Sequence, residues 1–140
     1  AALVLLGNKA LGEAIGQKPR AKIIAAAVID DDPLQVLGGC ISATEKLLHD
    51  NKLTSSDIDL FELHEAFAAT MVKAQSVLNI PSDKLNVNGG VIALGHPMGA
   101  TGSIMMGVLI DELERRDCKR GVVATSGAAG SGTALLVERV

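Results

Sequence analysis

The apolar residues of this chain fall into short runs and helical spacings that alternate along its length. Continuous runs of small aliphatic residues predict strands, and apolar residues three and four apart predict helices. The expected strands are Ala1–Leu6, Ala21–Ile29, Asp59–Leu63, Gly121–Thr125 and Thr133–Val137. The expected helices cover 8–15, with Asn8 as its cap and Gly16 at its end, then 39–50, 65–78 and 100–116. This alternation predicts a layered α/β fold, and we interpret residues 1–140 as one domain.

Composition narrows the class of protein. The net charge of −3 argues against a nucleic-acid or membrane-surface partner. Cys40 and Cys118 are too far apart for a CxxC motif and are typical of a reducing compartment. No apolar run reaches the roughly 18–20 residues that span a bilayer. We therefore expect a cytoplasmic protein, or a mitochondrial or peroxisomal one in a eukaryote.

One histidine stands in an unusual setting. His96 is preceded by Gly89, Gly90 and Gly95 and is followed by Pro97, Gly99 and Gly102. Glycine permits positive φ and close backbone approach, and proline fixes φ at about −65°. Such a loop presents an imidazole on a stiff backbone, which favours a chemical role over the alternative of a structural histidine. The loop has neither the Gly-Lys-Ser/Thr ending of a P-loop nor the glycine spacing of a dinucleotide site.

Two further segments carry candidate chemistry. His64-Glu65-Ala66-Phe67 lies where a strand is expected to meet a helix, so His64 is expected to face a cleft at the carboxyl ends of strands. Glu65 has either a functional role or only that of an acidic residue in a first helical turn. Phe67, at helical spacing, is more typical of a core. The small residues of Ser126–Gly132 either turn backbone N–H groups toward a ligand or simply connect a hairpin.

Together these three segments resemble the thiolase family. Gly89–Gly102 matches the catalytic-histidine loop Gly-Gly-x-Ile-Ala-x-Gly-His-Pro-x-Gly-Ala-x-Gly almost throughout. His64–Phe67 matches the Asn- or His-Glu-Ala-Phe motif, in the His form typical of trifunctional-enzyme β-subunits and related fatty-acid-oxidation thiolases. Gly130–Gly132, followed by an apolar strand through Glu138, matches the C-terminal glycine-rich loop. The resemblance covers essentially the whole chain.

The resemblance implies a thiolase C-terminal domain, with a mixed five-stranded sheet and helices on both faces. It also implies a nucleophilic cysteine in an N-terminal half outside this chain. The chain begins in an apolar run, as expected of a fragment or of a tightly trimmed domain. By the same resemblance, His96 activates that cysteine and His64 contributes to an oxyanion hole. Phe67, Gly95 and Gly127 are the expected substrate-binding residues. Acyl-CoA and CoA are the implied substrates, with no fixed cofactor and no metal, and the complete protein is expected to be a dimer or tetramer.

Ser126 departs from the family pattern. It occupies the position of the cysteine that shuttles the substrate α-proton in thiolases. A serine hydroxyl is a far poorer acid–base than a thiol at neutral pH, so condensation and its reverse are expected to be impaired. Either an engineered substitution or a natural protein with altered chemistry explains this serine.

Two functions follow from these residues. The first is the C-terminal half of an acyl-CoA thiolase, an acyltransferase of fatty-acid metabolism that cleaves 3-ketoacyl-CoA or runs the reverse Claisen condensation. This chain alone is then expected to be inactive. The second is a non-catalytic acyl-CoA-binding or scaffold module, which Ser126 favours and the intact pair of His64 and His96 disfavours.

Overall fold

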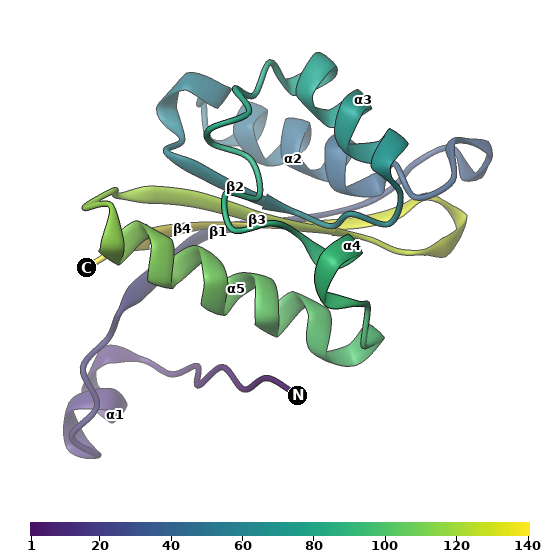
Figure 1. Ribbon diagram of the computed structural model, residues 1–140. Coiled ribbons are helices and arrows are strands. Elements are labelled where there is room, and N and C mark those ends of the chain that lie inside the picture. Colours follow the sequence, from purple (N-terminus) through teal and green to yellow (C-terminus); the bar gives the residue numbers. More distant parts are fainter.

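A single four-stranded sheet forms the centre of the molecule, whose computed structural model describes all 140 residues (Figure 1). Strands β1 (Ala21–Asp30), β2 (Leu60–Leu63), β3 (Arg120–Ser126) and β4 (Ser131–Arg139) lie in the order β1-β4-β3-β2. β4 is antiparallel to both neighbours, whereas β2 and β3 are parallel. The α/β class and the mixed sheet are confirmed, but the sheet has four strands and not five.

The expected strand Ala1–Leu6 does not form. This segment has no regular secondary structure and pairs with no strand, so Leu3 is 95% exposed. Beside β2, the chain around Leu85 instead makes one parallel bridge to Phe61. Phe61 donates its N–H to the Lys84 carbonyl, and Asn86 donates its N–H to the Phe61 carbonyl, both at 2.8 Å. The fifth position of the sheet is therefore a single bridge and comes from a different part of the chain.

Helices cover both faces of the sheet, as expected (Figure 1). Helices α2 (Gly39–Asp50) and α3 (Ala68–Leu78) lie on one face, and α5 (Met98–Arg115) lies on the other, preceded by the short α4 (Val91–Leu94). Successive side chains of β2 alternate between two apolar cores. Phe61 and Leu63 belong to the core under α2 and α3, whereas Leu60 belongs to the core under α5.

The remaining elements are short. Helix α1 (Lys9–Ala14) is capped as predicted, because Asn8 Oδ1 accepts the Leu11 N–H at 2.8 Å. Three 3₁₀ turns occupy Pro33–Gln35, Ser55–Asp57 and Ala128–Gly130. None of the helices combines the length and the apolar character that crossing a membrane requires.

Helix α3 begins later than its apolar spacing predicts, at Ala68 and not at Glu65. The His64 N–H donates to the Ala124 carbonyl at 2.9 Å, which extends the sheet by one residue beyond β2. The Glu65 carboxylate accepts the Ile92 N–H at 3.1 Å. These distant partners hold the segment between β2 and α3 in a non-helical path.

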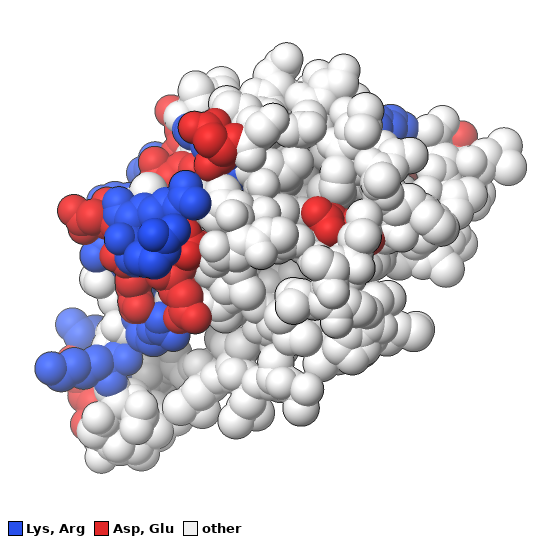
Figure 2. Space-filling view, viewed as in Figure 1, with Lys and Arg blue, Asp and Glu red and all other residues white.

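Charged side chains gather at the end of the molecule where α5 stops, and the rest of the face in Figure 2 is mostly uncharged. Arg20 forms ion pairs with Asp111 and Glu114 there, and Arg139 pairs with Asp117. These pairs join the start of β1, the end of β4 and α5 at the end of the sheet opposite the glycine-rich loops.

Candidate active site

The parallel pairing of β2 and β3 brings two of the sequence motifs to one edge of the sheet. Leu63 pairs with Ala124, so His64 leaves the end of β2 beside the last two residues of β3, Thr125 and Ser126. The carboxyl ends of adjacent parallel strands are a common place for ligand sites in α/β proteins. The register places His64 at this edge of the sheet, while its facing a cleft stays a prediction.

His64 and His96 are in contact. Their ring centroids lie 4.5 Å apart, with the ring planes inclined by 39°. His96 is exposed, and its Nδ1 lies 2.8 Å from Oγ1 of Thr101 in α5, which leaves Nε2 for other partners. Gly95, directly before it, has φ +85°, a conformation that glycine adopts at little cost. The exposed imidazole expected from the glycine-rich loop is present, while its role as a base stays a prediction.

His64 differs from its neighbour in being buried, with 4% of its surface exposed. Neither of its ring nitrogens has a hydrogen-bond partner in the protein, which is uncommon for a buried polar group. Burial lowers the pKa of His64 and the nearby His96 lowers it further, against the opposing effect of the Ser126 backbone and the Glu65 carboxylate. The lowered pKa favours the neutral imidazole of His64, which has one N–H donor and one acceptor nitrogen.

Ser126 is held at the beginning of α2. Its Oγ accepts the Cys40 N–H at 2.8 Å, in the first turn of that helix. The N-terminal end of a helix stabilises negative charge through the helix dipole. The Ser126 side chain thus lies toward the α2 face, whereas the two histidines lie beside α5. The structure brings His64 and His96 together. The Ser126 side chain lies on the other face of the sheet, toward the start of α2.

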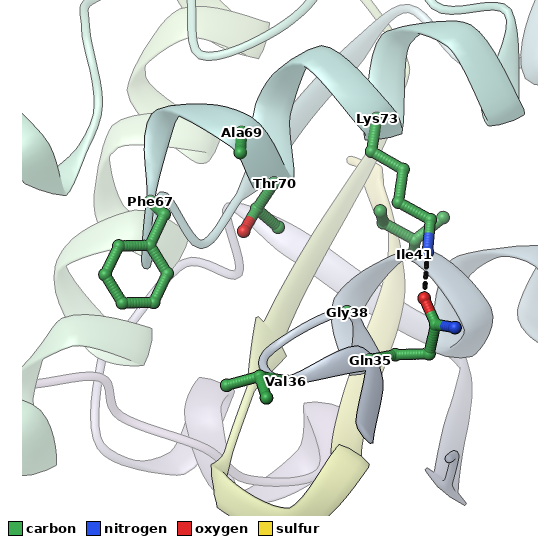
Figure 3. A pocket seen from close by; sticks show the side chains of 8 residues that line it. All are labelled: Gln35, Val36, Gly38, Ile41, Phe67, Ala69, Thr70 and Lys73. Carbon is green, nitrogen blue, oxygen red and sulfur yellow. Dashed lines mark hydrogen bonds between the residues drawn. The ribbon is translucent and has the colours of Figure 1, made fainter. Parts of the chain in front are cut away.

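Phe67 is not a core residue, because 58% of its surface is exposed at the start of α3. It lines a cavity of about 200 Å³ between the start of α3 and the segment that enters α2 (Figure 3). Lys73 donates from Nζ to Gln35 Oε1 at 2.8 Å across one side of this cavity. The other lining residues are Val36, Gly38, Ile41, Ala69 and Thr70.

The two candidate glycines use their N–H groups internally. Gly95 donates to the Val91 carbonyl, and Gly127 donates to the Ser131 carbonyl, both at 2.8 Å. The Ser126–Gly132 turn connects a hairpin, because β3 and β4 pair directly across it, and the interpretation that its backbone N–H groups face a ligand stays a prediction. A substrate-binding role for Gly95 and Gly127 stays a prediction, and it cannot rest on these two N–H groups as donors.

Asn86 and Thr101 gave no clear local signal in the sequence, and the role of Glu65 was left open there. Glu65 does not act in the first turn of a helix, since its carboxylate is bound to Ile92 N–H and to Asn86 Nδ2. Asn86, buried with φ +45°, and Thr101, buried in α5, hold the two histidine segments through their side chains. Their partners lie 5 to 27 residues away, beyond what local periodicity detects.

Comparison with known proteins gives consistent matches. The family model described as thiolase, C-terminal domain, matches residues 17–139. An acetyl-CoA acetyltransferase of Chromobacterium violaceum is 43% identical over 99% of this chain and 36% of its own length. A 3-ketoacyl-CoA thiolase of Serratia proteamaculans is 41% identical over the whole chain and 37% of its own length.

A solved structure supports the same relationship. The crystal structure of the Bacillus anthracis acetyl-CoA acetyltransferase superposes with a TM-score of 0.85 at 34% identity. The match covers 94% of this chain and 34% of that protein, so the chain spans little more than a third of the relatives it matches. On sequence and fold together, this chain belongs to the thiolase family and corresponds to its C-terminal domain.

Proposed function

We propose that this chain supplies the histidine-bearing part of a thiolase active site. In the complete protein, the site would transfer an acyl group between an enzyme cysteine and coenzyme A. The observation that carries the proposal is the contact between the buried His64 and the exposed His96, formed by two motifs 32 residues apart at one end of the sheet. Relatives that carry thiolase and acetyltransferase names support the reaction class.

His96 is assigned the proton transfer at the nucleophile. Thr101 engages its Nδ1, so Nε2 is the nitrogen that would take the proton from the cysteine thiol. The thiolate sulfur then forms a bond to the keto carbon of a 3-ketoacyl-CoA, and cleavage of the adjacent carbon–carbon bond releases the acetyl-CoA carbanion. That carbanion takes a proton, and the thiol of a second CoA removes the acyl group from the cysteine.

His64 is assigned the stabilisation of oxygen charge. A neutral imidazole donates one N–H, and its burial makes that donor effective because little water competes with it. Loss of one such donor typically costs about 2.7–4 kcal/mol of transition-state stabilisation. The opposing effects on its pKa leave the neutral form favoured, which is the form that this role needs.

Ser126 supports a second candidate function. The proton for the carbanion would come from the position of Ser126, where a hydroxyl replaces a thiol. A non-catalytic acyl-CoA-binding or scaffold role is favoured by this single residue. The two functions differ in whether the complete protein turns over 3-ketoacyl-CoA.

The test is thiolysis of 3-ketoacyl-CoA by the complete protein and by three histidine variants. We expect His96→Ala and His64→Ala to lower kcat by about 10²-fold or more. His49→Ala, an exposed histidine on α2, is the matched control and should retain full activity. Full activity in His96→Ala would contradict the enzymatic proposal. A wild-type protein that binds acyl-CoA without turnover would favour the scaffold role.

The proposal also covers the substrates, the activity of the isolated chain and the oligomeric state of the complete protein. Acyl-CoA and CoA act as substrates and not as a bound cofactor, and the isolated 140 residues have no acyl-transfer activity because the nucleophile lies elsewhere in the complete protein. We also propose a cytoplasmic dimer or tetramer. Light scattering of the complete protein would measure the oligomeric state.

A further inference from the structure

Glu65 links the two histidine segments through both of its carboxylate oxygens. Oε1 accepts from Asn86 Nδ2 at 3.0 Å, and Oε2 accepts from the Ile92 N–H at 3.1 Å. Ile92 lies in α4, the short helix that leads into Gly95 and His96. Glu65 itself directly follows His64. The Glu65 side chain therefore connects the chain next to His64 with α4, the short helix that precedes His96.

Asn86 fixes the other end of this link. Its Oδ1 accepts the Leu63 N–H at 2.8 Å, and its Nδ2 donates to the Leu63 carbonyl at 3.0 Å as well as to Glu65. Both protons of the amide are used, and the side chain is buried. The chain on both sides of His64 is thus tied to the same asparagine.

Gly90 leaves the space in which the carboxylate lies. A Cβ at this position would lie 2.1 Å from Glu65 Cδ and 2.3 Å from its Oε2. The obstructed group is the far end of a flexible side chain, which can move away. An alanine at position 90 would therefore displace the carboxylate while leaving the backbone path available.

We propose that Glu65 is a positioning residue: its carboxylate ties the end of β2 to α4 and thereby sets the contact between the His64 and His96 rings. The use of that contact in catalysis rests on the proposed function, whereas the contact itself does not. Glu65 touches neither substrate nor reacting atoms in this role. It acts only through the two histidines.

The test measures the histidines directly by NMR in the chain of 140 residues, without substrate. In the wild type we expect cross-relaxation between the ring protons of His64 and His96, since the centroids lie 4.5 Å apart. Glu65→Gln has one acceptor oxygen and cannot serve both donors, so the cross-peaks should fall several-fold. His49, remote on α2, should be unchanged and serves as the internal reference. Glu13→Gln, an exposed residue of α1, is the charge-matched control.

Gly90→Ala separates position from charge, because it retains the carboxylate and only displaces it. It should weaken the same cross-peaks in the wild-type background and have no further effect in Glu65→Gln, as expected for two changes to one interaction. Gly107→Ala, in the middle of α5, would place a Cβ with no neighbour within 4 Å and is its matched control. Unchanged cross-peaks in both Glu65→Gln and Gly90→Ala would overturn the inference.

Kinetics of the complete protein give the second readout. Glu65→Gln is expected to lower kcat by about 10²-fold with little change in KM, because misplaced groups affect the reaction more than binding. A wild type without thiolase activity would remove the proposed function but not the NMR result. Loss of ring contact with wild-type kcat would instead show that the contact is not used, which overturns the catalytic part of the inference.

Discussion

Thr101 Oγ1 lies 2.8 Å from His96 Nδ1, and Thr101 itself is buried in the first turns of α5. The hydrogen bond of one imidazole nitrogen decides which tautomer is present and so what the other nitrogen can do. The Thr101 hydroxyl can donate or accept, so it engages Nδ1 in either tautomer and leaves Nε2 open to another partner. It is a side-chain link between α5 and the glycine-rich loop, beside the hydrogen bond from the Met98 N–H to the His96 carbonyl.

Removal of that hydroxyl should impair the histidine without unfolding the domain. Thr101→Val preserves the branched shape, and we expect kcat of the complete protein to fall about ten-fold through loss of orientation. Thr101→Ser retains the hydroxyl and should stay near wild type. The nitrogen shifts of His96 should report the altered tautomer in the valine variant alone. Equal activity of the two variants would contradict this role for the hydroxyl.

Restoring a thiol at position 126 should produce an acidic cysteine. In Ser126→Cys the sulfur would take the place of Oγ beside the Cys40 N–H, at the N-terminus of α2. A thiolate is stabilised there, so we expect its pKa below the ordinary value of about 8.5. The pH dependence of alkylation measures it, with the wild type as background because burial raises the pKa of Cys40.

The same variant tests the proposed chemistry. We expect at least about a ten-fold gain in thiolysis by the complete protein, since a thiol near neutral pKa transfers protons far better than a hydroxyl. Ser131→Cys, in the same turn, is a suitable control for a thiol placed elsewhere. No gain in Ser126→Cys, despite a reactive nucleophilic cysteine, would count against the enzymatic role.

His64 should make the domain sensitive to acid. Its folded-state pKa is lowered below the value of about 6.5 for an unfolded chain, so the unfolded state binds more protons below that pH. The free energy of unfolding should therefore decrease as pH falls through and below about 6.5, by at most about 1.4 kcal/mol per pH unit from this group. Urea denaturation at pH 7.5 and pH 5.5 measures the change.

Two variants separate the contribution of His64 from general acid effects. His64→Asn, which places the amide of the common family motif at this position, should show a smaller loss over the same interval. His49→Asn should retain the wild-type dependence. An identical pH dependence in His64→Asn and wild type would contradict the assignment.

Glu62 should have the opposite effect on stability between about pH 4.5 and 8. It is buried in β2, and burial, followed by the charges of Glu65 and Glu112, raises the pKa of Glu62 to about 8. The folded state then binds more protons than the unfolded state between about pH 4.5 and 8, so stability declines as pH rises through that range. Glu62→Gln should reduce this decline, as measured by denaturation at pH 6 and pH 9. Glu45→Gln, on exposed α2 surface, is the control.

Local patterns predicted most of the fold because its strands and longer helices have clear periodicity. The spacing around Leu47 and Leu109 marks faces that are in fact buried. The same reasoning was wrong at Ala1–Leu6, where an apolar run finds no strand to pair with, and at 65–67, where long-range hydrogen bonds replace helical ones. A hydrophobic pattern shows which residues of a segment can be buried. It does not show which other segment they pack against or pair with.

The candidate site, like the fold, could be predicted from sequence only in part. His64 and His96 stand in conspicuous motifs, so both were found from sequence. Of the two roles left open for Glu65, the one in a first helical turn is wrong, because α3 begins at Ala68. The apolar spacing wrongly favoured a core position for Phe67, which borders a cavity, and its expected role in substrate binding stays a prediction. Asn86 and Thr101 were missed because they act through side-chain hydrogen bonds to residues that only the folded chain brings near: Asn86 binds Leu63 and Glu65, and Thr101 binds His96.

The placement of Ser126 on the α2 side and of the histidine pair on the α5 side has a consequence for ligand design. A compound that engages both must reach across the ends of β2 and β3. A fragment that binds on one side leaves the other side free, so two weak fragments, one for each side, could be found separately. Joined by a flexible tether of suitable length, they would gain affinity through effective concentration, and a tether too short to span the strand ends would lose that gain.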